Sequence, residues 1–458
     1  MAEHDVTVKN TLKALADTKK YSSIKDILTT MEPVDIAGIF NDMDERQLPV
    51  IFRLLPKDLA ADTFVEMEPE IQETLIRGFS DTELKAVIDE LYVDDAVDIV
   101  EEMPANVVRR MLAQADPAMR RSINEILQYP EDSAGSIMTT EYVSLRATMT
   151  VGDAIAHIRA NGVDKETIYT CYVTSNRKLV GLVSIKDLLL ARDDSTKVSD
   201  IMQENVISVQ TVTDQEQVGQ MFSKYNFIAL PVLDSEGRMV GIVTFDDAMD
   251  VMEEETTEDI QLMSGQTPSD KTYIRSNPFD LFLHRIPWLI VLMISSTFTG
   301  MIINHFELAL AANVILTAFI PTLMDTAGNS GSQSSVTIIR ALSLGEIEFK
   351  DLPRVILKEL LTALMCGVVL GTVCFAKLMI VDRNLLGNPD LTVKIALIVS
   401  LAMCITVLVA KILGGSLPIL AKKIGFDPAV MASPFITTCV DSLSLLVYFN
   451  IARTFLHT

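Results

Sequence analysis

The sequence of 458 residues contains few of the side chains that bind transition metals or carry redox chemistry. It has five cysteines and five histidines; no two cysteines have the spacing of a zinc or redox motif, and the histidines are scattered. A zinc or copper site is therefore not expected, and the cysteines, most of which lie in apolar runs, are expected to be reduced and buried. The sequence also lacks a Walker loop and a nucleophile with an adjacent base, so we expect no enzyme.

Positive charge is scarce in the first part of the chain. Up to Leu283 there are 51 acidic and 26 basic side chains, a net charge of −25, whereas the chain from His284 onward has 10 and 12, a net charge of +2. So acidic a surface repels phosphate and attracts cations, which excludes nucleic acid as a partner. The last 175 residues are mostly apolar, which excludes an ordinary soluble enzyme. The first residues contain no apolar run, so we expect no cleaved signal peptide and a cytoplasmic acidic half.

Residues 1–132 carry apolar side chains at helical spacing. Pro33, Pro56, Pro69 and Pro104 each precede such a run, and proline in this position is typical of a helix start. The pattern predicts an all-α N-terminal domain of short helices stacked as a solenoid.

Residues 137–252 contain one pattern twice, with the copies about 60 residues apart. Each copy alternates short β-rich runs with amphipathic helices, which predicts an α/β domain with internal pseudo-symmetry. The segment resembles a tandem pair of CBS domains. In such domains the Ser or Thr and the Asp of a G-x-x-S-x-x-D pattern often face a nucleotide ribose, with ATP as the expected modulator. The corresponding residues are Ser184, Asp187, Thr244 and Asp247. Alternatively, Ser184 and Thr244 cap helices.

An acidic connecting helix is predicted over residues 246–275, between this segment and the apolar part of the chain. Asp247, Asp250, Glu254 and Glu258 recur every three or four residues and therefore share one face of that helix. Like charges at this spacing destabilise an isolated helix. We consider two interpretations: a solvated face, and a connecting helix whose stability depends on bound cations.

Residues 284–458 contain five apolar stretches, each close to the length that crosses a bilayer. The predicted spans are 288–304, 308–324 with an extension toward 339, 355–381, 391–413 and 429–451. Basic residues gather in the predicted loops on one side, where they include Arg340, Lys350, Arg354 and Lys358, and Lys411, Lys422 and Lys423. This asymmetry predicts that the N-terminal half is cytoplasmic and that the C-terminus lies outside.

Polar residues inside these stretches point to function because hydrocarbon does not solvate them. Asp441 lies midway along the fifth stretch among hydroxyl residues, and Asp325 begins a run of small and polar residues in the second. Asp441 must face either a partner in the bundle or a water-filled pathway. We favour the pathway because the fifth stretch contains no basic residue that could pair with Asp441. Oxygen donors without clustered His or Cys indicate a hard cation, and Mg²⁺, which keeps its waters, is favoured over Ca²⁺.

Together these features resemble the MgtE-type magnesium channel family over nearly the whole chain. The most specific resemblance lies in Gly328-Asn329-Ser-Gly331-Ser-Gln333 and in Asp427-Pro428-Ala429 through Pro434, Thr437-Thr438 and Asp441. The resemblance implies a homodimer in the plasma (inner) membrane, lipid around it, a plug helix before the pore, and cytosolic Mg²⁺ sites that close the channel. The chain departs from the family pattern at Ser332 and Ser433, where some members have Asn, and at Ser444, where Gly is frequent.

The resemblance also implies roles for individual residues. Asp441 is expected to hold hydrated Mg²⁺ in the pore, and the predicted pore-lining residues are Asp325, Gly328, Asn329, Ser332, Ser433, Pro434, Thr437 and Thr438. The predicted cytosolic sensor ligands form one group: Asp94, Asp95, Asp250, Glu254, Glu258 and Asp259. Two alternatives stay open: a transporter coupled to H⁺ or Na⁺ with Asp441 as proton relay, and a membrane Mg²⁺ sensor that conducts nothing.

Overall fold

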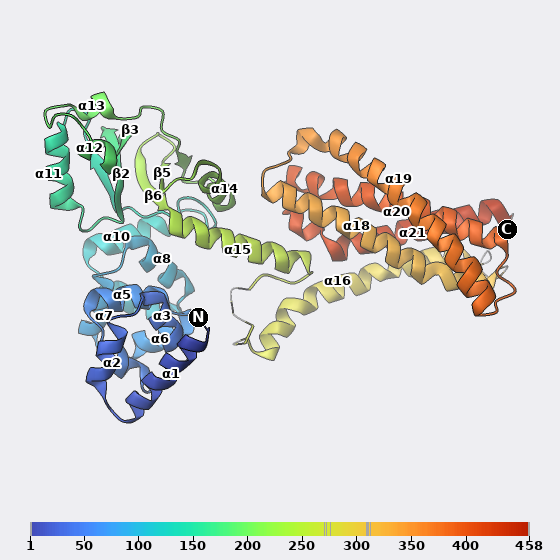
Figure 1. Ribbon diagram of the computed structural model, residues 1–458, viewed down its shortest axis with the longest axis horizontal. Helices are drawn as coiled ribbons and strands as arrows, with labels where there is room; N and C mark the ends of the chain where they lie inside the picture. Colours follow the sequence, from blue (N-terminus) through green and yellow to red (C-terminus); the bar gives the residue numbers. More distant parts are fainter. Residues whose placement is uncertain are drawn as a thin grey trace. The chain divides into compact units, whose positions relative to one another are not determined.

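The computed structural model describes residues 2–269, 271, 273–274, 276–307, 311 and 313–456 (Figure 1). The chain forms two compact units, Met1–Val251 and Met252–Thr458. The boundary falls inside one helix, α15 (Phe245–Met263).

The first unit begins with ten short helices. They are α1 (Ala2–Asp17), α2 (Tyr21–Leu28), α3 (Pro33–Phe40), α4 (Leu48–Phe52), α5 (Lys57–Val65), α6 (Pro69–Gly78), α7 (Asp81–Ile88), α8 (Val93–Glu102), α9 (Ala105–Gln114) and α10 (Pro117–Ile126). Proline stands at the first helical position of α3, α6 and α10 and caps α5 and α9, as its fixed φ favours. Alternate helices contact one another, α3 with α5, α5 with α7 and α7 with α9, so the expected short, stacked helices are present.

The core of this helical domain is aromatic and aliphatic. Phe52 lies at its centre, with ring centroids 6.4 Å from Phe40, 6.2 Å from Phe64 and 5.3 Å from Phe79. All four rings are buried. Tilted and edge contacts of this kind add to the burial of apolar area and hold helices α3 to α6 together.

Two small sheets follow, one for each copy of the repeated pattern. The first has β1 (Tyr142–Leu145), β2 (Thr167–Ser175) and β3 (Lys178–Ser184), with helices α11 (Val151–Asn161) and α12 (Ile185–Leu189). The second has β4 (Val209–Gln210), β5 (Ala229–Leu233) and β6 (Met239–Thr244), with α14 (Gln215–Tyr225) and α15. The short helix α13 (Val198–Ile201), which precedes β4, packs with the core of the first sheet. In each sheet the first pair of strands is parallel and the second antiparallel.

The two copies exchange their opening segments. Thr139, which precedes the first sheet, pairs with Ile242 of the second, and Gln203, which precedes the second, pairs with Leu182 of the first. The glycine beside each pairing is required: a Cβ on Gly241 would lie 2.6 Å from the Thr139 carbonyl oxygen, and one on Gly181 would lie 2.9 Å from that of Gln203. The predicted pseudo-symmetric pair is thus interlocked.

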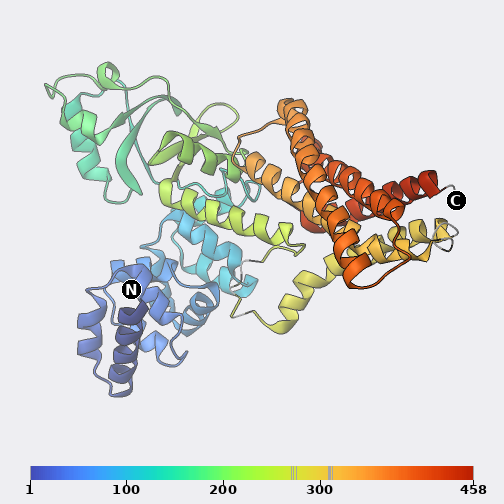
Figure 2. The same cartoon turned by 45° about the vertical axis from the view of Figure 1, so that its right-hand side comes forward.

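The second unit is helical. It contains α16 (Pro278–His305), a 3₁₀ turn η1 (Val314–Phe319), α18 (Ile320–Ser343), η2 (Phe349–Asp351), α19 (Leu352–Lys377), a π-helical segment η3 (Leu378–Leu385), α20 (Val393–Lys423), η4 (Pro428–Met431) and α21 (Ser433–Leu456). Helices α18 to α21 lie side by side, with α20 in contact with the other three, and α16 packs against α21 (Figures 1 and 2).

In the described residues, four helical segments are long and apolar enough to cross a membrane: 278–305, 349–385, 393–423 and 428–456. Helix α18 has the length, 24 residues, but carries the run of hydroxyl and amide side chains that begins at Asp325. It begins at Ile320, twelve residues later than the predicted second span, and residues 308–310 and 312 lie outside the described part. The count of five spans therefore stays a prediction.

Two predicted boundaries are wrong. The acidic helix α15 ends at Met263, well before residue 275, because Gly265 adopts φ +70° and terminates it; residues 270, 272 and 275 themselves lie outside the described part. The fourth span, predicted to end at residue 413, continues in α20 to Lys423, and Lys411, which the charge pattern groups with the loop residues, is buried among the helices. Arg340 and Lys358 likewise lie inside α18 and α19.

Candidate functional sites

Asp441 on α21 faces α18 at a position where α18 has no side chain. A Cβ on Gly328 would lie 3.6 Å from Oδ1 of Asp441 and 3.0 Å from Cγ2 of Thr437. Asp325, one turn earlier on α18, is close enough to interact electrostatically with Asp441 and accepts a hydrogen bond from Nδ2 of Asn329 at 3.1 Å. The predicted polar residues of the two helices therefore meet along one seam.

Oδ1 of Asp441 is buried and has no hydrogen-bond partner among the described residues. Such a carboxylate oxygen is costly to bury unless a cation or water binds it. The hydroxyls of Ser332 and Thr437 lie 3.4 Å apart across the same seam. The seam thus offers carboxylate, amide and hydroxyl oxygens, which are the donors that suit a hard cation.

The other predicted pore-lining residues lie differently. The hydroxyl of Thr438 donates to the carbonyl of Pro434 in its own helix at 3.0 Å. The ring of Pro434 lies against Gly265, where a Cβ would come within 2.9 Å of its Cγ. The side chain of Ser433 lies outside the described part of the structure.

The end of α15 contacts the helices of the second unit. Asp259 accepts a hydrogen bond from the hydroxyl of Ser343, the last residue of α18, at 3.0 Å. Leu262 and Met263 pack on a cluster formed by Ile339, Ala429 and Ala432. Burial raises the pKa of Asp259 above its ordinary value, against the hydrogen bond from Ser343, which lowers it. The predicted sensor residue Asp259 is therefore part of a docking contact, while Glu254 and Glu258 are exposed.

A carboxylate cluster lies in the first unit, where three segments far apart in the sequence meet. Asp94 and Asp95 occupy the first turn of α8, Asp247 lies in the first turn of α15, and Glu166 immediately precedes β2. Asp94 is 6% exposed, and its Oδ1, like Oε2 of Glu166, has no hydrogen-bond partner in the part of the chain described. Buried acceptors without donors are the feature that a bound cation would satisfy.

Burial and mutual repulsion raise the pKa of every member of this cluster. Burial is the larger cause throughout: it raises the pKa of Asp95 to about 7, that of Glu166 to about 8 and that of Asp247 to about 6. The pKa of Asp94 is raised well above its ordinary value, first by burial and then by the charge of Asp247. The helix N-terminus of α8 favours negative charge there, but burial outweighs it.

Four of the six predicted sensor residues divide among three places. Asp94 and Asp95 belong to the carboxylate cluster, and Asp259 contacts α18. Asp250 lies near Glu66 of the helical domain, whose pKa is raised first by burial and then by the charge of Asp250. Sequence reasoning missed Glu166, because it stands outside the repeated pattern and nothing local marks it. In the described residues no three His, Cys, Asp or Glu side chains form a ready metal-binding group. Because Mg²⁺ keeps several of its waters, one or two carboxylates suffice to hold it.

The residues predicted to contact a nucleotide form two helix caps. Ser184 and Asp187 make a capping box at the start of α12: the Ser184 hydroxyl donates to Asp187 Oδ2 at 2.6 Å and accepts from the Asp187 backbone N–H at 3.1 Å. Thr244 donates in the same way to Asp247 at the start of α15. The capping interpretation is therefore confirmed, and it leaves room for a second role.

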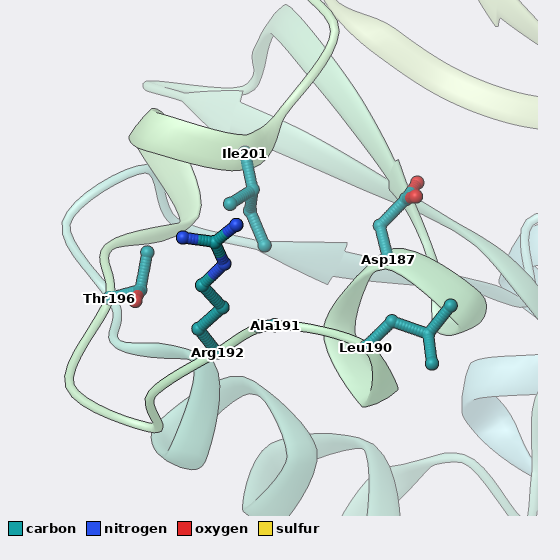
Figure 3. Close-up of a pocket in the computed structure, with 6 residues that line it drawn as sticks. All are labelled: Asp187, Leu190, Ala191, Arg192, Thr196 and Ile201. Atoms are coloured by element: carbon teal, nitrogen blue, oxygen red, sulfur yellow. The ribbon is translucent and has the colours of Figure 1, made fainter.

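Asp187 also lines a cavity of 440 Å³ in the first repeat (Figure 3). Leu190, Ala191, Arg192, Thr196 and Ile201 complete its lining. Figure 3 shows the guanidinium of Arg192 extending toward Ile201, with Asp187 on the far side of the cavity. A lining that combines apolar side chains with one guanidinium, one hydroxyl and one carboxylate suits a phosphorylated ligand with a sugar.

Comparison with known proteins matches three parts of the chain to family profiles. The profile of the intracellular N domain of MgtE matches residues 31–132, the CBS domain profile matches 134–194 and 198–254, and the MgtE profile described as a divalent cation transporter matches 320–451. The magnesium transporter MgtE of Thermus thermophilus is 35% identical over 439 residues, 95% of each chain. The chain belongs to the MgtE family. The resemblance found in the sequence is thereby confirmed.

Further MgtE relatives agree with this assignment. Magnesium transporter MgtE of Bacillus subtilis is 32% identical and covers 96% of this chain and 95% of its own. A crystal structure of the cytosolic domain of the Mg²⁺ channel MgtE in complex with ATP matches 53% of this chain and 99% of its own, with 34% identity and a TM-score of 0.51. The soluble part of a magnesium transporter matches 56% of this chain, with 29% identity and the same TM-score. The chain is thus an MgtE membrane protein with a CBS pair.

Proposed function

We propose that this MgtE chain is a channel that conducts Mg²⁺ passively and is closed by cytosolic Mg²⁺. One observation carries the proposal: Oδ1 of Asp441 is buried without a hydrogen-bond partner among the described residues and faces the glycine and polar side chains of α18. A hydrated dication beside Asp441 would satisfy that oxygen and explain why a carboxylate is retained among apolar helices.

The proposed pore uses α18 and α21. Helix α18 would then be a membrane span as well, which brings the number of spans to five. Its polar composition is compatible with this role, because a span that lines water need not be apolar on every side. Asp325, Asn329, Ser332 and Thr437 would contact the waters of the ion, and Gly328 leaves space for it. Two copies of the chain would place two such seams around one axis in the plasma membrane, with the first unit in the cytoplasm, as the distribution of basic residues suggests.

The proposed gate uses the carboxylate cluster and α15 as plug helix. Without metal, the charges of Asp94, Asp95, Glu166 and Asp247 repel one another in a place with little water. Mg²⁺ held by one or two of these carboxylates would remove the repulsion and favour the compact state of the first unit. A ligand favours the state that it binds more tightly. If Mg²⁺ binds the compact state of the first unit more tightly than the open one, and the compact state is the closed channel, high internal Mg²⁺ closes the channel.

We also propose that ATP modulates the channel through the cavity beside Asp187. The support is the cavity itself, with Arg192 placed for phosphate, and the ATP complex of the related cytosolic domain.

The test of conduction is Mg²⁺ flux into liposomes that contain the purified chain, at low internal Mg²⁺. Asp441→Asn should abolish flux while the protein elutes and assembles as the wild type does. The matched control is Asp390→Asn, a change at an exposed carboxylate outside the helices. Normal flux through Asp441→Asn would refute the proposed pore. Flux that requires a proton gradient at fixed voltage would favour the coupled transporter instead, and a wild type without flux would favour the non-conducting sensor.

A further inference from the structure

Three helices of the second unit share a chain of hydrogen-bonded polar side chains that the proposed pore does not use; two of its members are buried and the third, Glu359, is half-buried. Ser334 of α18 donates a hydrogen bond to Oε2 of Glu359 of α19 at 2.6 Å and accepts one from Nζ of Lys411 of α20 at 3.3 Å. Lys411 is 5% exposed and Ser334 3% exposed. One hydroxyl thus bridges an ammonium and a carboxylate in the interior of the bundle.

The bridge lies well inside the predicted membrane. Glu359 is seven residues from the start of α19, Ser334 nine residues from the end of α18 and Lys411 twelve residues from the end of α20. At 1.5 Å per residue these positions lie about 10 to 18 Å from the predicted cytosolic ends of the helices, within a hydrocarbon layer of about 30 Å. Charged side chains at this depth are retained where they have a function or a partner.

The helix backbones approach one another closely at the same level. The backbones of Gly331 of α18 and Gly414 of α20 are in contact, because a Cβ on Gly414 would overlap the Gly331 carbonyl. A Cβ on Gly415 would lie 2.8 Å from Cγ of Glu359, so Glu359 crosses α20 where α20 has no side chain. The other side of Gly331 touches α21, where a Cβ would lie 2.8 Å from Cγ2 of Ile436.

The bridge and the pore seam occupy the same three turns of α18. Gly328 faces Asp441, and Ser334, less than two turns further along, is held by Glu359 and Lys411. The glycines let the helix backbones approach closely. The directed hydrogen bonds among Lys411, Ser334 and Glu359 in addition constrain the rotation and height of α18 against α19 and α20.

We propose that Lys411, Ser334 and Glu359 are positioning residues for the permeation site: they set the rotation of α18 so that Gly328, Asp325 and Asn329 face Asp441. This inference rests on the proposed channel function. It assigns no ion contact to the three residues. It predicts that breaking the bridge changes how well the site binds the ion while leaving the assembly intact.

The test measures Mg²⁺ flux into liposomes as a function of Mg²⁺ concentration, together with the ratio of Ca²⁺ to Mg²⁺ flux. Ser334→Ala removes the bridging hydroxyl and leaves both charges in place. It should raise the Mg²⁺ concentration for half-maximal flux about fivefold, the effect of one lost hydrogen bond, and should raise the Ca²⁺ ratio. Ser334→Thr keeps the hydroxyl and should restore both values toward the wild type.

Two further variants separate positioning from folding. Thr337→Ala removes a hydroxyl that donates to the carbonyl of Gln333 in the same helix, and it should change neither value. Glu359→Gln, which keeps the shape of the side chain, should shift the half-maximal concentration in the same direction as Ser334→Ala, and it carries the test if Ser334→Ala does not assemble. Unchanged half-maximal concentration and unchanged ion ratio in both variants would overturn the inference.

Failure of the inference and failure of the proposed function give different results. If the wild type conducts, Asp441→Asn does not, and the bridge variants match the wild type, the proposed pore is supported and the positioning role is refuted. If the wild type does not conduct, both proposals are refuted.

Discussion

Neutralising one carboxylate of the cluster should stabilise the first unit when Mg²⁺ is absent. Burial, and after it the charge of Asp247, raises the pKa of Asp95 to about 7. At pH 8 the Asp95 carboxylate is ionised in both the folded and the unfolded chain, but ionisation costs more in the folded one. Asp95→Asn removes that cost, so the variant should unfold at a higher temperature than the wild type in a metal-free buffer.

The magnitude follows from the pKa. The difference between about 7 in the folded protein and the ordinary value of 3.8 corresponds to about 4 kcal/mol. Residual water and partial protonation of neighbouring carboxylates reduce this, and we expect about half, or about 2 kcal/mol. For a unit of this size, the midpoint of thermal unfolding should rise by about 4 to 8 °C.

Mg²⁺ should reverse the order of the two unfolding temperatures, so that the wild type becomes more stable than Asp95→Asn. The wild type gains stability by binding Mg²⁺, by about 2.7 kcal/mol when the ion is at 100 times its dissociation constant, whereas Asp95→Asn has lost one of the negative charges that attract it. The two curves of unfolding temperature against Mg²⁺ concentration should therefore cross. A purely structural role for Asp95 would place the variant below the wild type at every concentration.

A buried cysteine supplies the assay. Cys171 lies in β2 and is fully buried, while the other four cysteines belong to the second unit. Labelling of Cys171 by a maleimide, followed by mass spectrometry of its peptide, reports unfolding of the first unit in the full-length protein. Glu90→Gln changes an exposed carboxylate of the helical domain and serves as control. A metal-free midpoint for Asp95→Asn at or below that of the wild type would refute the reasoning.

Three further predictions follow from the described contacts. In metal-free buffer the first unit should lose stability as pH rises from 5 to 8. Asp95 and Glu166, with pKa values of about 7 and about 8, hold protons in the folded state that the unfolded chain has already released. Labelling of Cys171 at a series of pH values measures this, and a stability that rises with pH would contradict it. Gly331→Ala should destabilise the second unit by about 1 to 3 kcal/mol, because the added Cβ would lie 2.8 Å from Cγ2 of Ile436; thermal unfolding of the detergent-solubilised protein measures this, with Gly300→Ala, at a position with open space, as control. Arg192→Ala should weaken ATP binding about tenfold, as expected for loss of a charged hydrogen-bond donor; equilibrium dialysis against ATP measures this, and equal weakening by Arg159→Ala, an exposed change on α11, would argue against the cavity.

Features that depend on local sequence could be predicted. Proline marks the starts of α3, α6 and α10. Its ring fixes φ at a helical value, and it has no backbone N–H that would lack a hydrogen-bond partner at the first helical position. Asp441 and Asp325 could be paired because each is an acidic residue in a stretch that otherwise suits lipid, and such residues must turn toward the same interior. The residue types and their positions in the local sequence are sufficient for these conclusions.

Features that depend on distant contacts could not be predicted. The predicted sensor ligands do not share one place: on α15, Asp250 and Asp259 are nine residues, or about 14 Å, apart along the helix. Glu166 joins Asp94 only through tertiary packing. The charge of Lys411 alone groups it with the basic loop residues, and only the tertiary contact with Ser334, which in turn binds Glu359, allows α20 to bury it.

The interlocked CBS repeats have a consequence for protein engineering. Since Thr139 completes the second sheet and Gln203 completes the first, neither repeat is a portable module. A chain cut after residue 194 would present an unpaired backbone where Gln203 should lie, and a graft of the second repeat alone would lack Thr139. Truncations that aim to dissect regulation should keep or remove residues 134–254 as a whole.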